Sequence, residues 1–153
     1  MAKTDSPALL APGMHLLTLQ DLEAVAVTPF PGAPRRAELF QGLLLWVGAL
    51  RAHGLTGTLW IDGSFLTEKE CPGDIDCVLW NAAWVDPSAA TPEAQHQVAK
   101  LLDKASAEAL YNLDFYMEHP TPAQVFHREA YWRGILGFCH DRITAKGFAE
   151  ITL

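Results

Sequence analysis

The chain has 153 residues, half of them hydrophobic, and a formal net charge of −7 at pH 7. This length suggests one domain with a real core, and the apolar content excludes a disordered chain. The acidic balance gives no sign of a basic patch for nucleic acid, and no apolar run approaches the roughly 18 residues that a membrane helix needs.

The N-terminal 34 residues precede the main pattern. Residues 1–15 look extended and loosely held, and they make a poor signal peptide. Thr18 followed by Asp21 predicts a capped short helix that runs to about Val25. The prolines and glycine of 28–34 exclude a helix there. We therefore expect an N-terminal segment, 1–34, ahead of a single domain, 35–153.

The first half of that domain predicts one helix and two strands. From Arg35 to His53, apolar residues recur at helical spacing, and Gly54 suits the helix end. Two β-branched, aromatic or apolar runs, 58–61 and 77–80, then predict buried strands.

The second half adds further helices and strands. Residues 81–90 read as a loop, and Thr91-Pro92 begins a helix whose apolar face continues to Ala109. The later segments are predicted as strand, helix and strand at 111–117, 126–136 and 147–153. This order predicts an α+β (mixed α/β) fold with a short mixed sheet.

Cysteine and histidine usage bears on compartment and metal chemistry. The three cysteines, Cys71, Cys77 and Cys139, are odd in number and form no C-x-x-C pair, so we expect a reducing, cytoplasmic location. The six histidines lack zinc-site spacing.

Two acids open the second strand. Because side chains alternate along a strand, Asp74 and Asp76 share one face while Ile75 and Cys77 point to the core. Like charges on one face repel, and a divalent cation such as Mg²⁺, which is held by one or two carboxylates plus substrate phosphates, would compensate them.

The spacing of these acids from an upstream Gly-Ser carries a resemblance. Gly63-Ser64 follows the first strand, and Asp74-Ile75-Asp76 opens the next. Over about 37–118 the chain resembles the DNA polymerase β-like nucleotidyltransferase superfamily. The fuller string Asp-Gly-Ser-Phe-x-Thr-x-Lys-x-x-Pro-x-Asp-Ile-Asp is similar to a small, little-characterised bacterial subfamily of it.

The resemblance implies a small nucleotidyltransferase fold with helices on one side of the sheet. It also implies a transferase that uses Mg²⁺ or Mn²⁺ to move a nucleoside monophosphate from a nucleoside triphosphate to an acceptor hydroxyl. That acceptor could be a protein, an RNA or a small molecule. The implied catalytic and metal-binding residues are Asp74, Asp76 and Asp114, with Glu118 ranked behind Asp114. The implied nucleotide-binding residues are Gly63, Ser64, Lys69 and Thr67.

Other interpretations of these residues stay open. Asp74 and Asp76 could form a turn after Pro72-Gly73, Asp114 could pair with an arginine, and Lys69 could be a solvated loop residue. Asp62 could simply cap the turn. No arginine lies between Arg51 and Arg128, so phosphate binding would depend on metals, backbone amides and Lys69, or on basic residues that fold back: Arg128, Arg133, Arg142 and Lys146.

Two rival functions follow from the same pattern. The chain could be a binding module of this fold that works with a partner protein without turnover, such as a toxin–antitoxin component. Aromatic residues near Trp84 and Trp132 would then suit an interface. It could also be a metal-dependent phosphohydrolase. In every case, crowding the acids should raise at least one carboxylate pKa.

Overall fold

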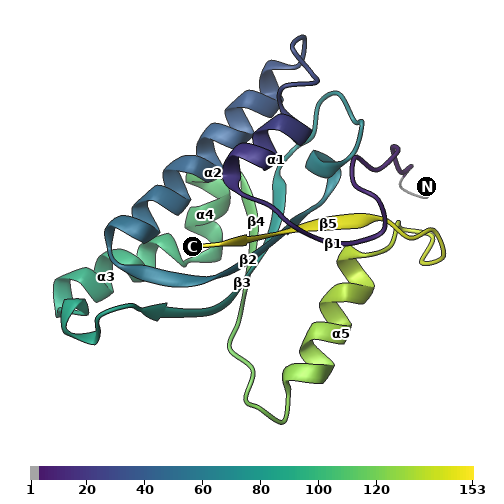
Figure 1. The fold of residues 1–153 in the computed structure, drawn as a ribbon. Coiled ribbons are helices and arrows are strands. Elements are labelled where there is room, and N and C mark those ends of the chain that lie inside the picture. Colours follow the sequence, from purple (N-terminus) through teal and green to yellow (C-terminus); the bar gives the residue numbers. More distant parts are fainter. Residues whose placement is uncertain (1–3) are drawn as a thin grey trace.

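The computed structural model describes residues 4–153, which form a five-stranded mixed sheet covered by α-helices (Figure 1). The spatial order of the strands is β1-β5-β2-β3-β4. Their bounds are β1 Gly13–Leu16, β2 Leu55–Asp62, β3 Ile75–Trp84, β4 Leu113–Glu118 and β5 Gly147–Thr152. The pairs β1/β5 and β3/β4 are parallel, and β2 runs antiparallel to both β5 and β3. The predicted α+β class is confirmed.

Four helices cover one face of this sheet: α1 Leu19–Ala26, α2 Pro34–Ala52, α3 Pro92–Leu101 and α4 Lys104–Tyr111. Helix α2 supplies the apolar stripe that its sequence predicts, and the stripe is buried against β2 and β3. Thr18 and Asp21 form the expected capping box at the start of α1. This face holds the main core of the protein.

The fifth helix, α5 (Val125–Leu136), lies on the opposite face (Figure 1). Its Trp132 and Leu136 pack on Trp60, Trp80 and Phe148 of the sheet. The expectation of helices on one side therefore holds for α1–α4 and fails for α5. Trp132 itself is only 7% exposed, whereas its neighbour Tyr131 is 51% exposed, so the aromatic surface expected in this region comes from the residue beside Trp132.

Some element boundaries also differ from the sequence predictions. Strand β3 continues to Trp84 through part of the predicted loop, because its last residues pair with the start of β2. The helix predicted from Thr91 to Ala109 is two helices, since the chain turns at Leu102 and Asp103 caps α4 with a hydrogen bond from the Ser106 amide.

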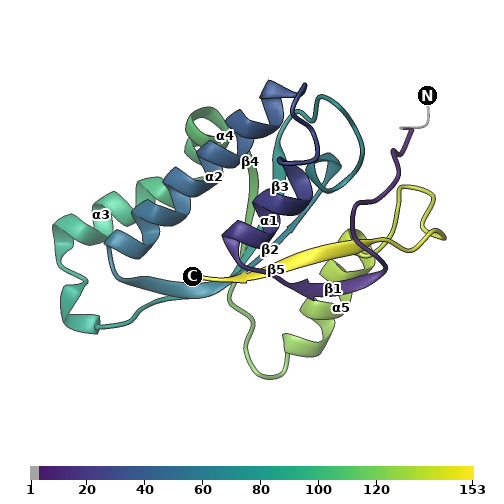
Figure 2. The ribbon, with the colours of Figure 1, turned by 45° about the horizontal axis from the view of Figure 1, so that its top comes forward.

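Part of the N-terminal segment is held more firmly than its sequence suggests. Strand β1 pairs with β5, and α1 buries Leu22 in the core. Ahead of β1, the Leu9 amide donates to Leu66 O at 3.0 Å, and the Glu68 amide donates to Pro7 O at 2.8 Å. Figure 2 shows this segment running beside the loop that precedes β5. Residues 4–9 thus form one wall of the region that contains the Gly-Ser turn.

None of the helices in the described part of the chain combines the length and the apolar character needed to cross a bilayer.

Candidate functional site

Three neighbouring strands place an acid at the same level of the sheet. Asp62 of β2 is the register partner of Asp76 in β3, and Asp76 is the register partner of Asp114 in β4. The alternate residues Ile61 and Cys77 are buried on the helix-covered side, so the acids occupy the α5 side. We call Asp62, Asp76 and Asp114 the acid row.

The Gly-Ser turn is built against the middle member of this row. Gly63 has φ +84° and ψ −166°, a combination that is essentially restricted to glycine. A Cβ added to Gly63 would lie 2.8 Å from Cγ of Asp76 and closer still to its Oδ2. The chain then makes one 3₁₀ turn from Ser64 to Leu66. Glycine is therefore required here both for its backbone and for the closeness of the carboxylate.

A buried arginine holds the loop that follows. The guanidinium of Arg36 in α2 donates to the carbonyl oxygens of Phe65 at 2.8 Å, of Thr67, and of Lys69. It also donates to Ala26 O at 2.9 Å and stacks over the ring of Phe30. Arg36 is not among the residues predicted from the sequence, although it occupies the first position of the apolar stripe of α2, where a charged side chain is unusual.

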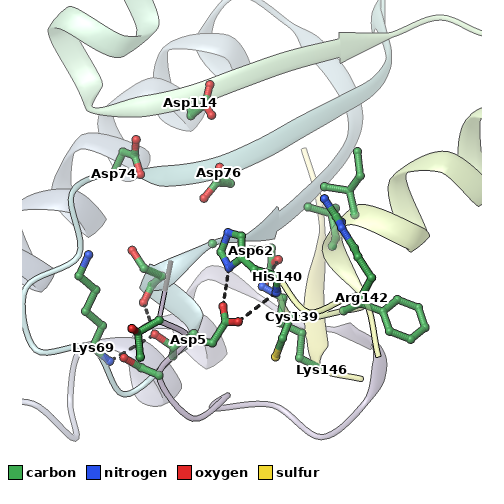
Figure 3. A pocket seen from close by; sticks show the side chains of 18 residues that line it. Asp5, Asp62, Lys69, Asp74, Asp76, Asp114, Cys139, His140, Arg142 and Lys146 are labelled. Atoms are coloured by element: carbon green, nitrogen blue, oxygen red, sulfur yellow. Dashed lines mark hydrogen bonds and ion pairs between the residues drawn. The ribbon is translucent and has the colours of Figure 1, made fainter. Parts of the chain in front are cut away.

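Thr67 and Lys69 lie in this loop. The Thr67 hydroxyl donates to Ser64 O at 2.8 Å and accepts from the Lys69 amide at 3.2 Å, so it closes the loop on itself. The Lys69 side chain reaches the edge of the cleft (Figure 3).

A cleft of about 290 Å³ lies over the acid row. It brings together every site residue that the sequence predicts: Gly63, Ser64, Thr67, Lys69, Asp74, Asp76 and Asp114. Asp62 lines it too, and residues 4–6 together with the loop before β5 form the facing wall (Figure 3). On this wall Asp5 binds His140, whose Nδ1 lies 2.5 Å from Asp5 Oδ1.

Two of the four basic residues considered for phosphate binding reach this cleft. Arg142 and Lys146 line it. Arg128 instead pairs with Glu118, and the guanidinium carbon of Arg133 lies 5.1 Å from the ring centroid of Trp60. Glu118, the second choice for a third catalytic acid, is thereby committed to an ion pair outside the cleft.

Asp62 forms a buried ion pair with Lys146 and is more than a turn cap. Lys146 Nζ lies 2.7 Å from Asp62 Oδ2, and the Asp62 side chain is almost fully buried. The other oxygen, Oδ1, has no hydrogen-bond partner in the described residues. Burial raises the pKa of Asp62 to about 7, although the charge of Lys146 acts to lower it. Asp62 is thus ionised near and above neutral pH only with the help of Lys146.

The other acids differ in how they are compensated. The pKa of Asp76 is raised to about 6, mainly by burial and also by the charges of Asp74 and Asp114. The rise expected from crowding is present, with burial as the larger cause. Asp114 is paired with a base, as one interpretation held, but the partner is Lys104, whose Nζ lies 2.6 Å from Oδ1.

The donor chemistry fits a divalent cation only in part. Carboxylates are the ligands that Mg²⁺ prefers, and Asp74 and Asp76 face the cleft together. Within the described residues, however, no three acidic, histidine or cysteine side chains converge on one point. The expected three-acid site is not formed as the side chains stand, since Lys104 holds Asp114. Two carboxylates completed by substrate phosphates match the usual Mg²⁺ arrangement.

The fold and the cleft together define an α+β protein with an acid row beside a Gly-Ser turn. The chain belongs to a family of unknown function, DUF6932, whose profile matches residues 2–152. No curated protein and no solved structure matches this chain.

Proposed function

We propose that the cleft binds a nucleoside triphosphate together with Mg²⁺ or Mn²⁺ and transfers its nucleoside monophosphate to an acceptor hydroxyl. The observation that supports this proposal is the close contact between the Gly-Ser turn and Asp76, with the cleft of about 290 Å³ lying over acids on two adjacent strands. Phosphoryl transfer needs positioning and charge neutralisation more than covalent help from the protein.

In this proposal the Gly-Ser turn and the cations around it bind the triphosphate. Gly63 brings backbone close to the cleft without a side chain, and successive amides of a tight turn bind phosphate oxygens. Lys69 and Arg142 line the same cleft and can neutralise the triphosphate, whereas Lys146 lines it while paired with Asp62. Lys69 and Arg142 would thus supply positive charge in a region of the chain that has no arginine between Arg51 and Arg128.

In this proposal the acids of the cleft bind the divalent cation. Asp74 and Asp76 would hold the cation, which neutralises the charge that develops on the phosphate oxygens during transfer. Asp114 faces the acceptor side and is held by Lys104, a half-exposed side chain. Movement of Lys104 toward solvent would release the Asp114 carboxylate for the acceptor hydroxyl.

A second candidate function is a binding module without turnover, acting with a partner protein. The two ion pairs favour it, because Lys146 and Lys104 already neutralise two of the three acids in the row. A protein with this arrangement could hold nucleotide in the cleft and never complete the metal site.

Label transfer separates these functions. The protein is incubated with α-³²P-labelled nucleoside triphosphates, Mg²⁺ and cell lysate, alongside Asp76→Asn and the control Asp86→Asn, which removes an acid remote from the cleft. Label on an acceptor with wild type and Asp86→Asn, lost in Asp76→Asn, supports the transferase. Nucleotide binding without label supports the module, and nucleotide breakdown without a labelled acceptor indicates a phosphohydrolase.

A further inference from the structure

A second cavity opens from the acid row toward α5. It measures about 160 Å³ and shares Asp76, Asp114, Ile135 and Leu136 with the larger cleft, so the two adjoin at the acids. Its remaining walls include Tyr116, Tyr131 and Trp132. No lysine or arginine of the described chain lines it. The smaller cavity therefore has aromatic walls and lacks the cations that line the larger cleft.

The aromatic walls are held in place by hydrogen bonds and ring contacts. The indole Nε1 of Trp132 donates to Glu118 Oε1 at 2.8 Å, and Arg128 Nε donates to the same oxygen at 3.0 Å. The hydrogen bond from Arg128 lowers the pKa of Glu118, so this acceptor is ionised. The ring centroids of Tyr116 and Tyr131 lie 5.1 and 5.3 Å from that of Trp132. This cavity is thus a preformed surface for a planar group.

The size of the cavity limits its occupant to a single ring. An apolar cavity of about 150 Å³ accommodates benzene, whereas small-molecule sites for larger ligands span roughly 300–1,000 Å³. The two acids that flank the proposed reaction form part of its wall. A nucleobase is separated from its own α-phosphate by a ribose, so a base would not bring a reacting atom to these acids. A ring that itself carries the attacking hydroxyl would do so.

We infer that this aromatic cavity is the acceptor subsite and that it takes one planar ring bearing a hydroxyl, the chemistry of a tyrosine side chain or another phenol. The inference rests on the proposed function and names its acceptor class. The phenolic oxygen forms a bond to the α-phosphorus, and the bond from that phosphorus to the oxygen bridging to the β-phosphate breaks. Its electron pair leaves with pyrophosphate, and the phenolic proton passes to water in the cleft.

Binding is tested without nucleotide, using p-cresol as the probe. Titration into the full chain should shift the Trp132 indole NMR signal saturably, with the signal assigned by its absence in Trp132→Phe. Tyr131→Ala should weaken binding about two- to tenfold, the effect of one aromatic contact. Phe126→Ala, on the same helix and 76% exposed outside the cavity, should not. The absence of a saturable shift, or equal affinity for the non-planar 4-methylcyclohexanol, overturns the ring site.

The acceptor role is tested by identifying the labelled group in the lysate reaction by mass spectrometry. Label on tyrosine or another phenol supports the inference. Label on serine, threonine or ribose hydroxyls overturns the acceptor class and leaves the proposed function standing. No label on any acceptor overturns the function and the acceptor role together, and p-cresol binding then decides the ring site alone.

Discussion

Gly63 and Asp76 lie so close together that no side chain at position 63 fits beside the Asp76 carboxylate. The Asp76 side chain lies where a Cβ of residue 63 would be, and the turn backbone adopts a conformation restricted to glycine. The conformation of the turn and the position of the Asp76 carboxylate therefore depend on each other, and a substitution at either residue should disturb the other.

Gly63→Ala should lower the free energy of unfolding by at least about 2 kcal/mol, since backbone strain of this kind and overpacking each cost about 1–3 kcal/mol. The matched control is Gly73→Ala in the same loop, where an added Cβ meets nothing within 4 Å. Adding Asp76→Ala to Gly63→Ala should recover the steric part and leave the backbone part. Urea unfolding measures all four proteins, and equal stability of Gly63→Ala and Gly73→Ala would contradict the packing argument.

Arg36→Met should destabilise the protein by about 3 kcal/mol or more, because each buried carbonyl that loses its partner costs about 1–3 kcal/mol. Arg36→Lys should rescue little, since one ammonium group cannot reproduce the planar fork of donors. Arg51→Met, at an exposed arginine near the end of the same helix, should cost less than about 1 kcal/mol. Hydrogen exchange should also show faster opening of residues 65–69 in Arg36→Lys. Unchanged exchange there would mean that the loop does not depend on Arg36.

The part of this architecture that could be predicted from sequence is the part encoded locally. Residues a few positions apart determine the apolar spacing of α2 and the capping box of α1. They also determine that Asp76 and Cys77 point to different faces of the sheet. Strand alternation and the Gly-Ser spacing likewise place Gly63, Ser64 and Asp76 in the cleft, whereas Asp114 joins them through the pairing of β4 with β3.

What could not be predicted depends on pairings between distant segments. Lys146 reaches Asp62 from 84 positions away only because β5 lies beside β2. The side of the sheet that α5 covers is set by where the chain crosses after β4, which no local pattern specifies. Arg36 is a local signal, because an arginine within an apolar stripe indicates a buried charge that must have partners elsewhere in the fold.

Breaking the buried pair should give a pH-dependent loss of stability. Lys146→Met removes the cation that pairs with Asp62, which should cost about 3–5 kcal/mol at pH 8, because the wild-type Asp62 is ionised and paired there and the variant must either bury a lone carboxylate or protonate it. At pH 5 the loss should be smaller, because the raised pKa of about 7 leaves the buried carboxyl neutral. The double variant Asp62→Asn/Lys146→Met should lie close to wild type at both pH values. Denaturant unfolding at pH 5 and 8 tests this, and an equal loss at both would contradict the assigned pair.

Asp76→Asn should flatten the dependence of stability on pH between about 4 and 6. The folded-state pKa of Asp76 is raised from 3.8 to about 6, so its stabilising contribution is complete below pH 3.8 and is lost as the pH rises through 6. The variant should therefore gain stability relative to wild type as pH rises. Asp86→Asn should leave the slope between pH 4 and 6 almost unchanged, because hydrogen bonds from Ser88 lower the pKa of Asp86 below 3.8 and its contribution therefore changes only at more acidic pH. A constant difference between wild type and Asp76→Asn from pH 4.5 to 7 would refute the raised pKa.

The most direct test of the central claim is the affinity of the protein for a non-hydrolysable nucleoside triphosphate, measured by calorimetry with Mg²⁺ and with chelator. The account predicts that wild type binds at least about tenfold more tightly with Mg²⁺, which corresponds to about 1.4 kcal/mol. Asp76→Asn should bind equally weakly in both conditions, and Asp86→Asn should behave as wild type. Wild-type affinity that is the same with and without Mg²⁺, or that survives unchanged in Asp76→Asn, would contradict a metal-dependent nucleotide site at the acid row.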